Sequence, residues 1–278
     1  MNWSIITDSS CNLHNLNTET KNITFSKIPL IFTTDNTDYL DNSDLNIESF
    51  LKEIKNSSNI CKTSCPPPGA WYEEFKKGDN ILAITISSQL SGSYNSALTA
   101  QKMLLEHYPD KNICVIDSKG AGSKLDLMVT KITKLIQNNY SFDEVVCEAK
   151  KYSDNLYTLF TLSSFDNLIK NGRMSKFTGF LAGKLGIMGI GIGSKEGKIN
   201  IIHKTRGMNK CLSLLIDTLK EKKFTGNEII ISHCFNQSMA DKLSELIKSN
   251  WPNSTIKILS TSGLCSFYAE EGGLIIAF

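Results

Sequence analysis

Strand-like and helix-like segments alternate along almost the whole chain of 278 residues. In the N-terminal half, an apolar run at 80–86 precedes an amphipathic helical pattern over 91–108, and a second apolar run follows at 112–116. Further strands are expected at 3–7, 28–32, 157–162, 198–203, 228–232 and 255–259, and further helices at 47–55, 70–77, 122–137, 142–155, 208–222 and 239–249. Repeated strand–helix units favour sheets that are flanked by helices and are largely parallel. We therefore expect an α/β protein.

The length of the chain allows two domains of ordinary size, and the pattern divides most naturally near residue 155. We expect an N-terminal α/β domain over 1–155 and a C-terminal α/β domain over 156–278. The composition, 41% hydrophobic and 21% charged, is that of an ordinary globular protein. The formal net charge of +2 gives no reason to expect nucleic acid or a membrane surface as the main partner.

No stretch approaches the roughly 20 apolar residues that span a bilayer, so no stable membrane insertion is expected. The N-terminus has neither a basic region nor a cleavable apolar stretch, and we expect a cytoplasmic protein. The eight cysteines are irregularly spaced and form no Cys-x-x-Cys pair. This spacing favours reduced core cysteines and gives no indication of a metal site.

Arginine is rare in this chain. Of the 30 basic residues, 28 are lysine, and Arg173 and Arg206 are the two arginines. Only arginine offers a planar fork of donors for bidentate contacts to an anion. The two residues are therefore either candidates for anion contacts or chance survivors of a codon bias.

Hydroxyl side chains follow several predicted strands, where ligands bind in parallel sheets. They occur at 7–10, 87–93 and 117–118, and the pair Thr63-Ser64 precedes a proline run. Ser91 lies where the helix over 91–108 begins, so its hydroxyl and the free backbone N–H groups suit an anion. The alternative is that Ser91 is a simple helix N-cap.

Enzyme motifs are not found. The nucleophile pattern Gly-x-Ser-x-Gly is missing around Ser91. Neither of the phosphate-binding patterns Gly-x-x-x-x-Gly-Lys-[Ser/Thr] and Gly-x-Gly-x-x-Gly occurs in the chain. Four histidines are available as bases, and the strand-end positions of His203 and His233 suit a structural role. A hydrolase with Ser91 as nucleophile remains the less favoured alternative.

The segment 177–193 combines glycines with large apolar side chains and suits a long apolar pocket, or else close packing of a helix against a sheet. Its candidate wall residues are Phe177, Phe180, Leu181, Leu185, Ile187, Met188 and Ile190.

Several motifs occur in the order and spacing of the DegV family, which the chain resembles over nearly its whole length. They are Thr7-Asp8-Ser9-Ser10, Lys62-Thr63-Ser64-Cys65-Pro66, Ile86-Ser87-Ser88-Gln89-Leu90-Ser91-Gly92-Ser93-Tyr94, Val115-Ile116-Asp117-Ser118, Asn171-Gly172-Arg173-Met174-Ser175 and Lys204-Thr205-Arg206-Gly207. Both arginines fall inside these motifs.

The resemblance implies a two-domain α/β protein that holds a long-chain fatty acid and is not itself an enzyme. It implies the fatty-acid-binding subunit of a bacterial fatty acid kinase, whose separate ATP-binding subunit phosphorylates the carboxylate for phospholipid synthesis. By motif, Thr63 and Ser91 would bind the carboxylate with Arg173 nearby, Arg206 would contact the headgroup or the kinase, and 177–193 would line the acyl tunnel. The bound fatty acid is a ligand, and no cofactor is implied.

The chain departs from the family pattern in two places. Cys65 stands where Gln is common. Many members carry His-Thr-Gly-x-Gly near the C-terminus, whereas this chain reads Tyr268-Ala269-Glu270-Glu271-Gly272-Gly273. Tyr268 thus takes the place of a histidine tied to headgroup and kinase contacts, and two glutamates near a carboxylate would repel it unless an arginine pairs with them. A lipid carrier or sensor without a kinase partner therefore stays open as an alternative.

Overall fold

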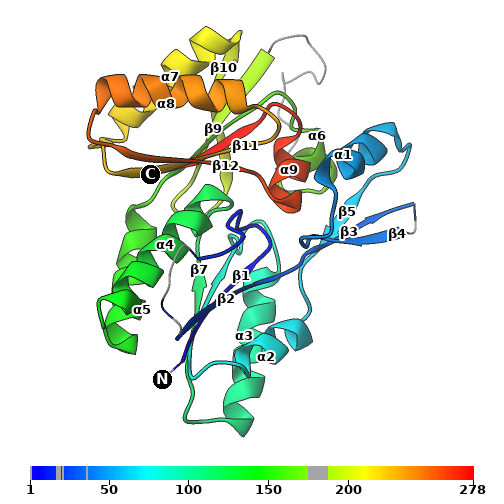
Figure 1. Ribbon diagram of the computed structural model, residues 1–278. Coiled ribbons are helices and arrows are strands. Elements are labelled where there is room, and N and C mark those ends of the chain that lie inside the picture. The colour runs from blue at the N-terminus through cyan, green and yellow to red at the C-terminus, as the bar shows by residue number, and fades with distance from the viewer. Residues whose placement is uncertain (1, 17–19, 21, 36, 175–186) are drawn as a thin grey trace.

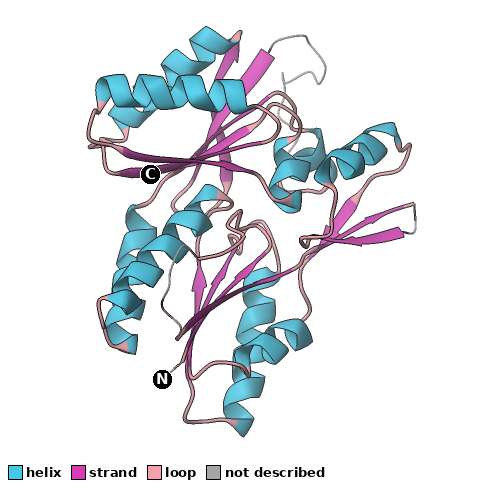
Figure 2. Ribbon diagram, viewed as in Figure 1, coloured by secondary structure: helices cyan, strands magenta, loops and turns pink. Residues whose placement is uncertain are grey.

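The computed structural model describes residues 2–16, 20, 22–35, 37–174 and 187–278. Its strands form a four-stranded sheet, a six-stranded sheet and a small three-stranded sheet, and helices pack against these sheets (Figures 1 and 2). None of the helices in these ranges is long and apolar enough to cross a bilayer.

The four-stranded sheet is parallel throughout and belongs to the N-terminal half. Its strands, in spatial order, are β2 (Ile23–Ile28), β1 (Trp3–Asp8), β6 (Asn80–Thr85) and β7 (Asn112–Asp117). The two central strands are buried at every residue, as parallel strands covered on both faces must be. The helices that cover its two faces are α2 (Pro68–Phe75) with α3 (Ser93–His107), and α4 (Ser123–Gln137) with α5 (Phe142–Asn155).

Local signals explain where these helices begin. Pro68 lies in the first turn of α2, where a missing N–H costs no hydrogen bond. In α5, the side chain of Ser141 accepts from the backbone of Glu144 and the Glu144 carboxylate accepts from the Ser141 backbone. This reciprocal capping explains why the helix begins at Phe142, as predicted.

The predicted strand at 28–32 is two strands in the structure. The chain leaves the parallel sheet at Ile28, and Pro29 separates it from β3 (Ile31–Thr34). β3 pairs antiparallel with β4 (Thr37–Leu40) and β5 (Lys62–Ser64) in the three-stranded sheet, against which α1 (Ile47–Asn56) packs. This sheet lies to the side of the four-stranded sheet in Figure 1.

The six-stranded sheet is built from the C-terminal half. Its strands, in spatial order, are β10 (Ile199–Arg206), β9 (Ile187–Gly193), β8 (Thr158–Leu162), β13 (Leu274–Ala277), β11 (Glu228–His233) and β12 (Thr255–Ser260). One face is covered by α7 (Met208–Glu221) and α8 (Gln237–Asn250), with a core of aliphatic side chains between them. The other face meets the short helices α6 (Asp166–Lys170) and α9 (Gly263–Ala269) and one side of α4.

The expectation of largely parallel strands is wrong for this second sheet. Only β11 and β12 run parallel, around the crossover helix α8, and the other neighbouring pairs are antiparallel. Hydrophobic periodicity marks a strand and its buried faces but carries no information on direction. The direction follows from connections such as the tight β9–β10 hairpin and from β13, which inserts between β8 and β11.

Candidate functional site

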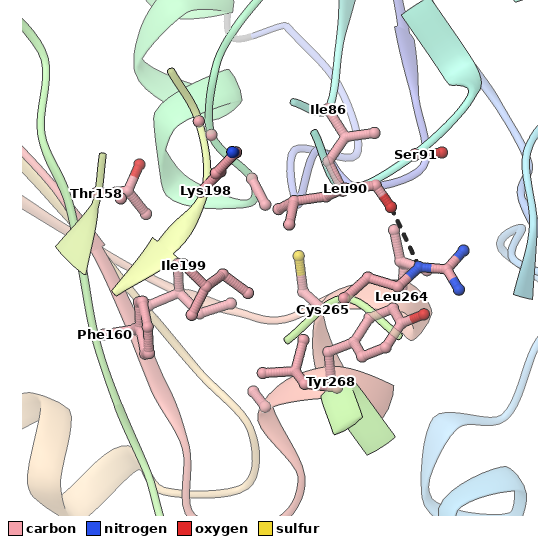
Figure 3. Close-up of a pocket in the computed structure, with 18 of the residues that line it drawn as sticks. Ile86, Leu90, Ser91, Thr158, Phe160, Lys198, Ile199, Leu264, Cys265 and Tyr268 are labelled. Atoms are coloured by element: carbon pink, nitrogen blue, oxygen red, sulfur yellow. Dashed lines mark hydrogen bonds between the residues drawn. The ribbon is translucent and has the colours of Figure 1, made fainter. Parts of the chain in front are cut away.

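A mainly apolar cavity lies where the six-stranded sheet faces the N-terminal loops and α9 (Figure 3). The empty space in and around it amounts to about 900 Å³, a figure that includes open solvent at its mouth. Its apolar wall consists of Leu30, Cys65, Ile86, Leu90, Ala121, Phe160, Leu162, Leu168, Ile199, Leu264, Cys265, Ala269 and Ile275. The wall therefore comes from both halves of the chain.

Four polar residues of the predicted headgroup site also line this cavity. Thr63 lies on β5, Ser91 precedes α3, Arg173 follows α6, and Tyr268 lies on α9. Figure 3 shows Ser91 and Tyr268 on the same side of the cavity. Residues more than 200 positions apart are thus brought together at one end of an apolar space.

Thr63 and Tyr268 are joined directly. The Thr63 Oγ1 and Tyr268 Oη atoms lie 2.7 Å apart and form a hydrogen bond. Burial raises the pKa of the Tyr268 phenol, although the Thr63 hydrogen bond and the positive charge of Arg173 oppose the rise. Tyr268 is therefore a neutral phenol at physiological pH and supplies one O–H donor at the cavity wall.

Arg173 is held by backbone carbonyls, not by an acidic partner. Its Nε donates to the carbonyl oxygen of Leu90 at 3.2 Å, and Nη1 donates to the carbonyl of Asn171. Within the described ranges, no carboxylate forms an ion pair with it. The guanidinium thus carries a positive charge that is fixed in position and available to an anion.

Ser91 lies two residues before the first residue of α3, so the helix begins later than its predicted start. Its Oγ accepts from the backbone N–H of Ser93 at 3.3 Å, while Gly92 occupies the N-cap position without a side-chain bond. The positive end of a 15-residue helix is therefore directed toward this part of the wall. Ser91 therefore lines the cavity and is not the N-cap of α3, a position that Gly92 takes.

The opposite side of the cavity also carries polar groups. Lys119, Lys198 and Thr158 contribute to its wall there, and Lys119 forms an ion pair with Asp154 at 3.0 Å. Figure 3 shows Thr158 and Lys198 across the cavity from Ser91 and Tyr268.

Of the described residues in the predicted tunnel wall at 177–193, Gly193 lines this cavity. Phe177, Phe180, Leu181 and Leu185 lie outside the described residues. Met188 and Ile190 do not line this cavity, because they pack into the core under α7 and α8. Ile187 is on β9 but does not belong to the cavity wall either.

β9 alternates, so its glycines take the face opposite to Met188 and Ile190. Gly193 lines the cavity, and Gly191 packs against the Phe160 ring. Gly193 thus leaves space at the cavity, whereas the space beside Gly191 is filled by the Phe160 ring.

Arg206 lies away from the cavity. It is the last residue of β10, and its side chain is exposed. The two glutamates after Tyr268 are also directed elsewhere: Glu271 is exposed, and the Glu270 carboxylate accepts from the Ser164 hydroxyl at 2.8 Å. Neither glutamate lines the cavity, so the repulsion expected from the sequence does not arise at this wall.

Sequence reasoning missed most of the apolar wall. Phe160, Leu162 and Thr158 share one face of β8 at alternate positions, a signal that the short strand at 157–162 already contained. Leu264 and Cys265 lie on α9, a helix that was not predicted. In the part of the chain that is described, no cluster of three or more His, Cys, Asp or Glu is arranged to hold a metal ion.

The fold and this cavity define a class of α/β protein in which a mainly apolar cavity, with hydroxyls and a guanidinium at one end, is lined by both halves of the chain. The family model described as "Uncharacterised protein, DegV family" matches residues 2–278. The chain belongs to the DegV family, which confirms the resemblance read from its motifs.

Relatives match over the full length. A DegV domain-containing protein of Streptococcus gordonii is 40% identical over 278 residues, which cover 100% of this chain and 99% of that protein. The crystal structure of the Streptococcus pneumoniae Fatty Acid Kinase (Fak) B3 protein loaded with linoleic acid is 39% identical, with a TM-score of 0.97 over 100% of this chain and 99% of that one. A DegV family protein from Eubacterium eligens loaded with heptadecanoic acid is 32% identical, with a TM-score of 0.94 over 99% and 98% of the two chains.

Proposed function

We propose that this protein binds a long-chain fatty acid, with the acyl chain in the cavity and the carboxylate against Thr63, Ser91 and Arg173. The observation that carries the proposal is the collection of hydroxyls at one end of a mainly apolar cavity, beside a guanidinium that no carboxylate of the described residues pairs with. The fatty acids bound by the Streptococcus pneumoniae and Eubacterium eligens proteins support it.

The energetics suit an amphiphilic ligand. Each buried methylene contributes about 0.8 kcal/mol, so a long acyl chain binds without covalent chemistry. A carboxylate is costly to bury unless it meets donors, and the Thr63, Ser91 and Tyr268 hydroxyls with the Arg173 charge provide them.

We further propose that the bound carboxylate is presented to a separate ATP-dependent kinase subunit that forms the acyl phosphate. The similarity to a protein named as part of a fatty acid kinase supports this step. Arg206 suits contact with the partner, because it is exposed and lies outside the cavity. A lipid carrier or sensor that meets no kinase is the alternative, and Tyr268 in place of histidine is the feature that favours it.

A hydrolase using Ser91 lacks support at this site. The described residues that line the cavity include no histidine to act as a base, and Ser91 Oγ is engaged by the Ser93 amide.

The first test is mass spectrometry of the purified protein, native and after organic extraction. We expect a stoichiometric fatty acid. The double variant Thr63→Val/Ser91→Ala should lower fatty-acid affinity by about a hundredfold or more, because each of the two lost bonds to a charged group is worth roughly 1.5–3 kcal/mol. Ser64→Ala, an exposed neighbour on the same strand, is the matched control and should bind normally. A protein that is empty and takes up no added fatty acid would exclude the proposal.

The kinase step has a separate test. Purified kinase subunit and ATP are added to the loaded protein, and acyl phosphate is trapped as the hydroxamate. Arg206→Ala should retain its lipid but give less product than wild type, whereas Lys210→Ala, an exposed cation of the adjacent helix α7, should behave normally. Loss of lipid from Arg206→Ala would contradict the assigned role, and no product from wild type would favour the carrier or sensor.

A further inference from the structure

Phe160 is a large aromatic residue in the cavity wall, on the side opposite the polar residues Ser91 and Tyr268. It lies on β8 between Thr158 and Leu162, on the face that lines the cavity, and is 7% exposed. In Figure 3 it lies across the cavity from Ser91 and Tyr268, next to Ile199. An acyl chain whose carboxylate meets Ser91 would therefore extend toward the Phe160 ring.

The ring depends on a glycine of the neighbouring strand. Phe160 and Gly191 lie opposite each other in the antiparallel pairing of β8 with β9. A methyl group added at Gly191 would lie 2.1 Å from Cζ and 2.5 Å from Cε2 of Phe160. The ring thus occupies the space that a side chain at residue 191 would fill.

Backbone conformation does not explain why residue 191 is a glycine. The φ angle of Gly191 is not in the positive region that favours glycine, unlike that of Gly197 or Gly207. The close approach of the Phe160 ring, together with the Asn200 carbonyl oxygen 2.8 Å from the same added methyl, is what excludes a side chain.

We propose that Phe160, seated over Gly191, forms the end wall of the cavity and sets the length of the acyl chain that the protein accepts. This inference rests on the proposed function. A side chain at residue 191 would displace the Phe160 ring toward the cavity and shorten the cavity. Removal of the ring would lengthen the cavity. Each methylene that is excluded from or admitted to the cavity changes affinity by about fourfold.

The test measures the affinities of a series of saturated acids, from dodecanoic to eicosanoic, for the whole protein, with thermal unfolding as the check on folding. In Phe160→Ala, the ratio of eicosanoic to hexadecanoic acid affinity should rise by about fourfold or more relative to wild type. Gly191→Ala should shift the preference toward shorter acids, and the double variant Gly191→Ala/Phe160→Leu should move it back.

Gly193→Ala is the matched control on the same face of β9. Its added methyl would meet Thr158 only at 3.6 Å, an ordinary contact, and leaves the Phe160 ring in place. An equal shift in Gly193→Ala would overturn the proposal, because general loss of volume would then explain the result.

The Phe160 variant keeps the proposal testable if Gly191→Ala does not fold. A folded Phe160→Ala protein with the wild-type length profile would overturn it. If wild type bound no acid of the series, the proposed function itself would fail, which is a different outcome from an unchanged profile.

Discussion

At the scale of single residues, Glu270 has a backbone conformation that glycine normally adopts. Its φ of 53° and ψ of 174° lie close to a region that is nearly closed to other residues and costs roughly 1–3 kcal/mol. In the family pattern, Glu270 falls on the first glycine of His-Thr-Gly-x-Gly. The carboxylate accepts from the Ser164 hydroxyl and from the backbone of Asn167, at the start of α6. These bonds offset the strain and tie α9 to the helix that precedes Arg173.

This balance predicts different effects of two substitutions. Glu270→Ala loses both hydrogen bonds and keeps the strained backbone, so the free energy of unfolding should fall by about 1–3 kcal/mol. Glu270→Gly loses the same bonds but relieves the strain, and should stay closer to wild type. Urea unfolding of the two variants gives the comparison. Equal losses would show that the backbone at Glu270 is not strained.

At the scale of elements, helix α9 is held at its first residues by the three-stranded sheet. The Asp41 carboxylate, which follows β4, accepts from the backbone N–H of Leu264 at 2.9 Å. Gly263 has no room for a side chain, because a methyl there would lie 2.3 Å from Asp41 Oδ1. α9 carries Tyr268 and part of the apolar wall, so Asp41 positions one side of the cavity.

The Asp41 contact predicts a dependence of stability on pH. Burial raises the pKa of Asp41 from 3.8 to about 6, despite hydrogen bonds from Ser9 and Leu264. Because the folded pKa exceeds the unfolded one, ionisation of Asp41 opposes folding, and its contribution to stability declines as the pH rises from about 4 to above 6. The change is on the order of 2–3 kcal/mol.

Asp41→Asn should remove this part of the pH dependence, because the amide oxygen can still accept from Leu264 and carries no charge. The measurement is the free energy of unfolding from pH 4 to 7.5 for wild type and variant. Asp44→Asn, an exposed neighbour, is the control. An unchanged difference between pH 4 and 7 in Asp41→Asn would contradict the assignment.

At the scale of the whole molecule, buried polar contacts join the two larger sheets. The Asn12 amide nitrogen donates to Asp126 on α4 and to the Ser232 hydroxyl on β11, each at 3.0 Å, and its oxygen accepts from the Ser262 backbone at 2.9 Å. At another point, the Ser87 hydroxyl donates to the Gly197 carbonyl in the β9–β10 turn at 2.8 Å. These contacts fix the halves whose faces enclose the cavity.

Removal of the Asn12 amide should therefore affect both stability and ligand binding. Asn12→Ala leaves the Asp126 carboxylate and the Ser262 N–H without these partners, and the free energy of unfolding should fall by about 2–4 kcal/mol. Asn209→Ala, an exposed residue of α7, should change it little. Denaturant unfolding and fatty-acid affinity are measured together, and a fully stable Asn12→Ala protein would contradict the role given to this contact.

Much of the fold could be predicted from local sequence, because helices and buried strands have periodic hydrophobic patterns. The helix over 142–155 was predicted residue for residue, and α3 was displaced by two residues at its start. The three-stranded sheet, α9 and β13 were missed, since short elements carry too few residues for a period to show. The division at residue 155 stays a prediction, although the strands of the two larger sheets do fall on either side of it.

The sequence by itself determined the strand–helix alternation, the family and the chemical identity of the polar residues, because each follows from a local pattern or motif. Only the tertiary structure decided strand direction in the second sheet, the placement of Thr63 beside Tyr268, and the assignment of the cavity wall to β8, β10, β13 and α9. These are contacts between segments far apart in the chain. They depend on how whole elements pack, and no local pattern encodes them.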